Sequence, residues 1–184
     1  MNLADWFDRG MKPEEYTNRM KTFQDETMDI YSKFRVPEGD EELLNKWKKE
    51  NLRVIALTED WCGDAMLNNP ILLRIAEKAG MEVRMLLRDE NLELMDQYLT
   101  NGTSRAIPIY IFINEDGKER AVWGPRADEV QRFVDEERSK LPPTDSPGFP
   151  DRQKEMYGRL TAQYSEDPAV WQQVYESIKS RLMA

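Results

Sequence analysis

Apolar, strand-like runs alternate with helical patterns in the middle of the chain, and this alternation limits the fold more than any other feature. Strands are expected at 52–58 (LRVIALT), 81–87, 107–113 (IPIYIFI) and 119–123, and helices at 69–80, about 91–99 and about 126–140. A turn at 114–118 (NEDGK) joins the last two strands. The pattern predicts an α/β fold with a central mixed sheet and helices on both of its faces.

The N-terminal part has a helical pattern instead. Pro13 suits the first position of a helix, and apolar residues follow at spacings of three and four. These residues are Tyr16, Met20, Phe23, Thr27, Ile30 and Phe34. They predict one long helix that ends before Pro37 and packs on its own domain. Dimerisation through the same stripe is the alternative. A shorter helix is expected at about 41–50.

The C-terminal part begins with a segment that is too rich in proline for regular structure. Residues 141–150 (LPPTDSPGFP) contain four prolines and form a linker by this criterion. Two helical stretches follow, at about 152–164 and from Asp167-Pro168 onwards. The expected organisation is therefore an N-terminal helical extension (1–40), a main domain (41–140), the linker, and a helical tail (151–184) that packs on the domain.

Charge and composition exclude several classes of function. The net charge is −9 with no basic cluster, so nucleic acid is not an expected partner. The chain has no histidine and one cysteine, which argues against His-dependent catalysis, an internal disulfide and a zinc site. We expect no metal and no cofactor. No apolar run spans a bilayer and the first ten residues do not resemble a signal peptide, so we expect a cytoplasmic protein without a membrane partner.

The single cysteine, Cys62, lies a few residues after a buried strand and before a helix. A thiol at a helix N-terminus faces unpaired N–H groups, which favour the thiolate. Most lone cysteines are buried and inert. Here Glu59, Asp60, Gly63 and Asp64 surround Cys62 with polar residues typical of a surface turn. The pattern therefore favours a nucleophilic thiol over a core residue.

Two motifs resemble the thioredoxin superfamily. Trp61-Cys62-Gly63 after a strand is similar to that family's active-site turn, and Arg105-Ala106-Ile107-Pro108 before an apolar strand is similar to its cis-proline loop. Phe112, Asp116-Gly117 and Gly124 fall where the family has its hairpin and a glycine. The resemblance covers roughly 41–140. It implies a thioredoxin fold with a cis Ile107–Pro108 bond beside Cys62.

Three departures from the family pattern bear on function. Ala65 stands where the family has its second cysteine, and Ala56 where it has a buried acid. Asp64 stands where thioredoxin has proline. Its carboxylate stabilises the helix start but opposes a nearby thiolate. Arg105 is expected to offset it.

The resemblance implies a monothiol redox protein. Cys62 would attack a disulfide and form a mixed disulfide, while the backbone before Pro108 holds the partner chain as an added strand. The implied substrate-binding residues are Trp61, Gly63, Asp64, Arg105, Ile107 and Pro108. Trp61 would either shield the sulfur or simply pack beside the turn. An external thiol would then release the product.

The implied partners are proteins that contain disulfides or carry a small thiol. The releasing thiol would be glutathione, bacillithiol or a second protein. Two alternatives stay open: a redox-inactive binding module that uses the groove around Pro108, and a peroxide-reactive sensor thiol. Enzymatic activity therefore stays undecided, although one cysteine excludes a dithiol reductase that works alone.

Overall fold

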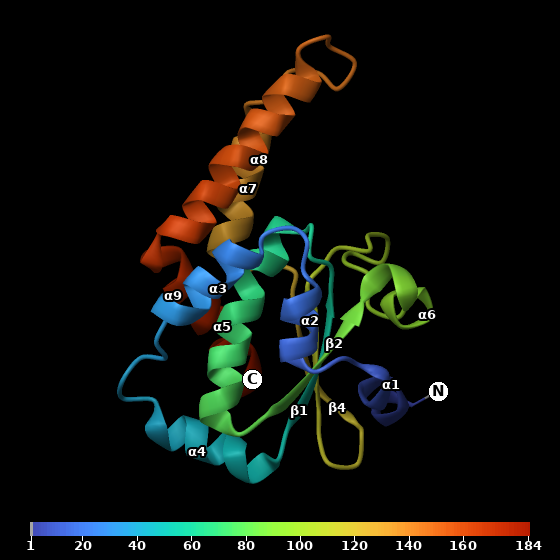
Figure 1. Cartoon of the computed structure of the whole chain (residues 1–184), viewed down its shortest axis with the longest axis vertical. Helices are drawn as coiled ribbons and strands as arrows, with labels where there is room; N and C mark the ends of the chain where they lie inside the picture. The colour runs from blue at the N-terminus through green and yellow to red at the C-terminus, as the bar shows by residue number, and fades with distance from the viewer. Residues whose placement is uncertain (1) are drawn as a thin grey trace.

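The computed structural model describes residues 2–184, and its centre is a four-stranded mixed sheet (Figure 1). The strands are β1 (Arg53–Thr58), β2 (Glu82–Leu87), β3 (Ile109–Ile113) and β4 (Glu119–Trp123), in the order β2-β1-β3-β4. β1 runs parallel to β2 and antiparallel to β3, and β3 and β4 form a hairpin. The predicted α/β fold with a mixed sheet is confirmed.

Helices cover both faces of this sheet. They are α1 (Leu3–Arg9), α2 (Pro13–Arg19), α3 (Gln24–Lys33), α4 (Glu41–Glu50), α5 (Gly63–Ala79), the short 3-10 helix η1 (Arg88–Glu90), α6 (Leu92–Met95), α7 (Asp128–Ser139), α8 (Phe149–Glu166) and α9 (Pro168–Met183). Successive residues of β1 face opposite sides, since side chains alternate along a strand. Val54 and Ala56 join the larger core with α3, α4, α5 and α9, while Ile55 and Leu57 join the smaller core with α1 and α6.

The single long helix predicted from Pro13 to Phe34 is wrong. The chain forms α2 and α3 instead, separated by a turn in which Phe23 has a φ of 59°. This turn lets the backbone N–H of Lys21 donate to Asp60 Oδ2 over 2.7 Å, next to Cys62. The apolar spacing continues through the break because Tyr16, Met20, Ile30 and Phe34 all face the same core.

Two other helices differ from their expected extents, and one was not expected. The helix expected at 69–80 begins at Gly63 and carries Pro70 in its interior. The helix expected at 91–99 is only the four-residue α6. The sequence reasoning also missed α1, which begins with a reciprocal capping box between Asn2 and Asp5.

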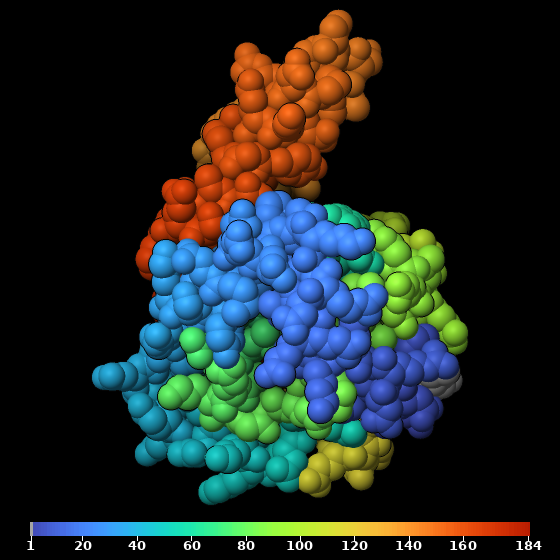
Figure 2. Space-filling model, viewed as in Figure 1, coloured from blue at the N-terminus to red at the C-terminus, as the bar shows by residue number. Residues whose placement is uncertain are grey.

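The C-terminal helices have two different roles: α7 and α8 form a projecting arm, and α9 packs on the body of the domain. α7 and α8 lie side by side and project from the body, with the proline-rich segment at the tip of this arm (Figures 1 and 2). α9 returns to the body and packs on α5, α7 and β4. Asp40 anchors it, since it accepts hydrogen bonds from Tyr175 (2.5 Å) and Lys179 (2.9 Å). Within residues 2–184, no helix combines the length and hydrophobicity needed to cross a membrane.

Candidate functional site

Cys62 occupies the N-cap position of α5, directly after the turn that leaves β1. It is partly buried, and its Sγ donates a hydrogen bond to the carbonyl oxygen of Ile107 at 3.5 Å. The two sequence motifs, 45 residues apart, therefore meet at one place in the fold. The sequence-predicted residues Cys62, Ile107 and Pro108 lie together at this place.

The loop opposite Cys62 contains a cis Ile107–Pro108 bond, and a second cis bond joins Gly124 to Pro125. The two loops touch so closely that a Cβ at Gly124 would lie 2.2 Å from Pro108 O. Gly124 also has a φ of 133°, where side chains are strained. A glycine is therefore required for the two loops to approach each other.

Burial dominates the electrostatics of Cys62. It raises the pKa of the thiol from 9.0 to about 11, and the Asp64 carboxylate adds to the rise. The backbone N–H groups of Ala65 and Asp64, and the Arg126 guanidinium, act in the opposite direction but are outweighed. The thiol is therefore protonated at neutral pH. This finding corrects the expectation that the helix N-terminus activates it.

Asp64 has a different partner from the one expected. Arg126 binds it through two contacts, Nε to Oδ1 at 2.9 Å and Nη2 to Oδ2 at 2.6 Å, and Tyr164 donates to Oδ1 at 3.0 Å. Arg105 pairs with Asp96 instead. The expectation that Arg105 offsets Asp64 is therefore wrong. No local signal marked Arg126 or Tyr164, which lie 62 and 100 residues from Asp64 in the sequence.

Trp61 and Gly63 flank the thiol on the surface. The Trp61 side chain is half exposed, and the Arg88 guanidinium carbon lies 5.0 Å from the centroid of its ring. A Cβ at Gly63 would meet the Thr161 methyl at 3.2 Å, so α8 lies directly against the turn.

Ala56 and Ala65, which replace the family's acid and second cysteine, are fully buried. Thr58 shares a strand face with Ala56, and Asn69 shares a helix face with Ala65. Asn69 donates to Thr58 over 2.9 Å and accepts from the Tyr110 hydroxyl at 2.6 Å. Neutral groups satisfy one another here, and no carboxyl takes part. Sequence reasoning missed this network, because Thr58 ends an apolar run and Asn69 stands between Asn68 and Pro70, where it suits the start of a helix.

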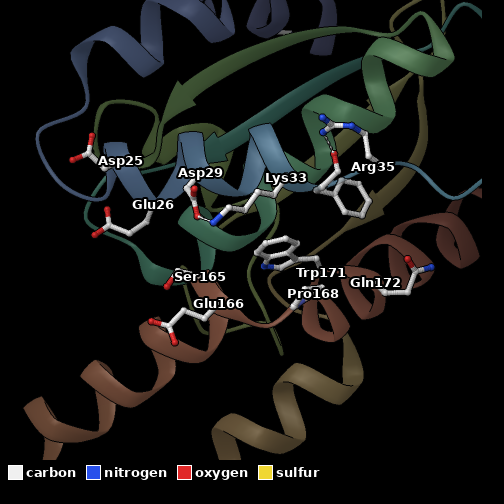
Figure 3. A pocket seen from close by; sticks show the side chains of 11 residues that line it. Asp25, Glu26, Asp29, Lys33, Arg35, Ser165, Glu166, Pro168, Trp171 and Gln172 are labelled. Atoms are coloured by element: carbon white, nitrogen blue, oxygen red, sulfur yellow. Dashed lines mark hydrogen bonds and ion pairs between the residues drawn. The ribbon is translucent and has the colours of Figure 1, made fainter.

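A groove of about 900 Å³ lies elsewhere, between α3 and the corner joining α8 to α9 (Figure 3). The carboxylates of Asp25, Glu26 and Glu166 line it, together with Trp171, whose Nε1 donates to Tyr164 O at 2.7 Å. None of the sequence-predicted site residues lines this groove. Among residues 2–184, no group of three or more His, Cys, Asp or Glu side chains could hold a metal ion.

Comparisons with known proteins agree with this geometry. A family model described as thioredoxin matches residues 10–138, and so includes α2 and α3 as well as the sheet. No curated protein matches the chain.

Two solved structures are similar in fold. A protein of unknown function from Pseudomonas aeruginosa has a TM-score of 0.63 and 15% identity, with 98% of each chain covered. An HIV epitope-scaffold has a TM-score of 0.56 and 16% identity, with 98% of this chain and 99% of that one covered. The family model spans most of the chain, and its fold is the one seen here. The chain belongs to the thioredoxin family.

Proposed function

We propose that this protein is a monothiol thioredoxin-like protein that exchanges disulfides through Cys62. The observation that carries the proposal is the position of Cys62, partly exposed at the start of α5 and in contact with the Pro108 loop. A disulfide reaching this point meets the sulfur beside a half-exposed tryptophan and a loop that can hold a partner chain.

The exchange conserves the number of disulfides. The Cys62 thiolate attacks one sulfur of a partner disulfide, a Cys62–partner disulfide forms, and the second partner sulfur leaves as a thiolate. Because Cys62 is the only cysteine in the chain, nothing inside the protein can resolve this product. An external thiol, such as glutathione, bacillithiol or a second protein, attacks it and regenerates Cys62. The proposed substrates are proteins with a disulfide or an attached small thiol.

Because the pKa of the Cys62 thiol is raised, fast exchange requires that the partner protein binds before it reacts. With a pKa of about 11, about one molecule in ten thousand carries the thiolate at pH 7. Small disulfides therefore react slowly. A docked partner reacts faster, because a bound, oriented disulfide raises the effective concentration at the sulfur. The proposal favours protein partners for this reason.

The test is trapping of the mixed disulfide. The protein is incubated with excess oxidised glutathione at about pH 9, and intact mass is measured before and after addition of dithiothreitol. The expected result is one glutathione moiety per chain, stable until dithiothreitol is added, and no adduct on Cys62→Ser. Because small disulfides react slowly with this thiol, incubation continues until a reference thiol with a similarly raised pKa is fully modified; a wild-type chain that is still unmodified at that time would contradict the proposal.

A second function is a redox-inactive binding module that uses the surface around Pro108. Two observations favour it. Ala65 and Ala56 stand where a dithiol cycle needs a second cysteine and a buried acid, and the raised pKa of Cys62 makes its thiol a poor nucleophile at neutral pH. It predicts no adduct in the trapping experiment.

A further inference from the structure

Three segments that are distant in the sequence converge on the Asp64 carboxylate. Asp64 is the second residue of α5, Arg126 lies between the cis Pro125 and α7, and Tyr164 is on α8. The Arg126 and Asp64 side chains are only 15% and 12% exposed. Every Asp64 oxygen has a donor: Oδ1 accepts from Arg126 Nε and from Tyr164, and Oδ2 accepts from Arg126 Nη2. The carboxylate is therefore fixed beside Cys62.

Other contacts hold the two donors in place. Arg126 Nη1 donates to Gln131 Oε1 at 2.9 Å, and Asn68 Nδ2 donates to Pro125 O at 3.0 Å, so the Arg126 segment is tied to both α7 and α5. Trp171 Nε1 donates to the backbone oxygen of Tyr164. The Asn68 bond ties the Arg126 segment to the helix that carries Asp64, so the Tyr164–Asp64 bond is the contact of this cluster that depends on the position of α8 relative to the turn.

The cluster acts on Cys62 through charge. Asp64 is the largest electrostatic influence on Cys62 and opposes ionisation, whereas Arg126 favours it. A hydroxyl that donates to a carboxylate spreads the negative charge and weakens its effect on a neighbour. The other titratable groups that face Cys62, Tyr16 of α2 and Tyr110 of β3, remain neutral because burial raises the pKa of both.

We propose that Arg126 and Tyr164 are positioning residues that restrain Asp64, and that α8 thereby supports the reactivity of Cys62. The inference rests on the proposed thiol–disulfide exchange, and it adds that the position of α8 regulates the rate of that exchange. Because Tyr164 belongs to the projecting arm, a partner that pulls α8 from the turn breaks the Tyr164–Asp64 bond and slows exchange. The arm is therefore coupled to the site without touching the sulfur.

The test is a double-mutant cycle between Asp64→Asn and Tyr164→Phe, read as the rate of Cys62 alkylation by iodoacetamide at about pH 9. Asp64→Asn should raise the rate about threefold, since one pKa unit gives tenfold more thiolate but a less nucleophilic one. Tyr164→Phe should lower it about twofold in the wild type and change nothing in Asp64→Asn. Tyr157→Phe, an exposed tyrosine on the same helix, is the matched control.

Two results would overturn the inference: an unchanged rate in Tyr164→Phe, or an equal fall in both backgrounds, which would indicate a general structural effect. Thermal unfolding of each variant verifies that it is folded. Arg126→Gln tests the second positioning residue and is expected to slow alkylation about threefold. Failure of the proposed function is distinguishable. It would show as an absent glutathione adduct on the wild type, whereas the cycle is measured by alkylation.

Discussion

Replacing Ala65 by cysteine tests how the turn is built. Ala65 is the third residue of α5 and is buried, and Cys62 is the N-cap of the same helix. Side chains three residues apart at a helix start face the same side, at a separation that a disulfide can bridge. We expect Ala65→Cys to form a disulfide between Cys62 and the introduced thiol under mild oxidation, and to gain a dithiol reductase activity towards insulin.

The energetic effect follows from loop size and burial. Closing a loop of only four residues restricts the unfolded chain by about 2 kcal/mol in the chain-entropy model. The added sulfur at a site that is 2% exposed costs about 1 to 3 kcal/mol in the reduced form. The reduced variant should therefore be less stable than the wild type, and oxidation should restore about 2 kcal/mol.

The assay combines a free-thiol count with urea unfolding, in the presence and absence of dithiothreitol. The thiol count should fall from two to zero on oxidation, and the urea midpoint should rise. Ala76→Cys is the matched control, because Ala76 is similarly buried on α5 but lies too far along the helix to reach Cys62. Two free thiols in oxidised Ala65→Cys would show that the N-terminus of α5 does not have the described geometry.

Three further predictions concern the surroundings of the site. Gly124→Ala should destabilise the protein by more than about 3 kcal/mol in urea unfolding, because its Cβ would lie 2.2 Å from Pro108 O; wild-type stability would refute the close approach. Tyr110→Phe should cost about 1 to 3 kcal/mol in the same assay, since it leaves the buried Asn69 oxygen without a donor. Hydrogen bonds from α9 lower the pKa of Asp40, so its contribution to stability is present at neutral pH and is lost below about pH 4. Asp40→Asn should therefore reduce the loss of stability on acidification below about pH 4, and an unchanged loss would contradict this.

Local sequence patterns sufficed for the sheet and for the position of Cys62. β3 is buried on both faces, and its continuous apolar run identifies it without any tertiary knowledge. Cys62 follows β1 and precedes α5, and both neighbours have clear local signals. The resemblance of the Trp61-Cys62-Gly63 and Ile107-Pro108 motifs to the thioredoxin family then predicted that the two loops lie side by side.

Features that depend on distant contacts could not be predicted. The break between α2 and α3 leaves the apolar spacing intact, and the contact that accompanies it, between Lys21 and Asp60, spans 39 residues. The choice of Arg126 over Arg105 as the partner of Asp64 depends on how the loop after Gly124 packs on α5. The raised pKa of Cys62 likewise reflects burial, and its neighbours in the smaller core include Ile107, 45 residues away in the sequence.

The central claim is that Cys62 is a partly exposed thiol that stays protonated at neutral pH, at the start of α5 in a thioredoxin fold. The most direct measurement is the rate of Cys62 alkylation by iodoacetamide against pH, with circular dichroism at each point to verify that the protein is folded. With a pKa of about 11, the rate should rise about tenfold for each pH unit up to about pH 10 and reach half of its maximum only near pH 11. A plateau reached below about pH 9, or no alkylation of the folded protein at any pH, would contradict the account.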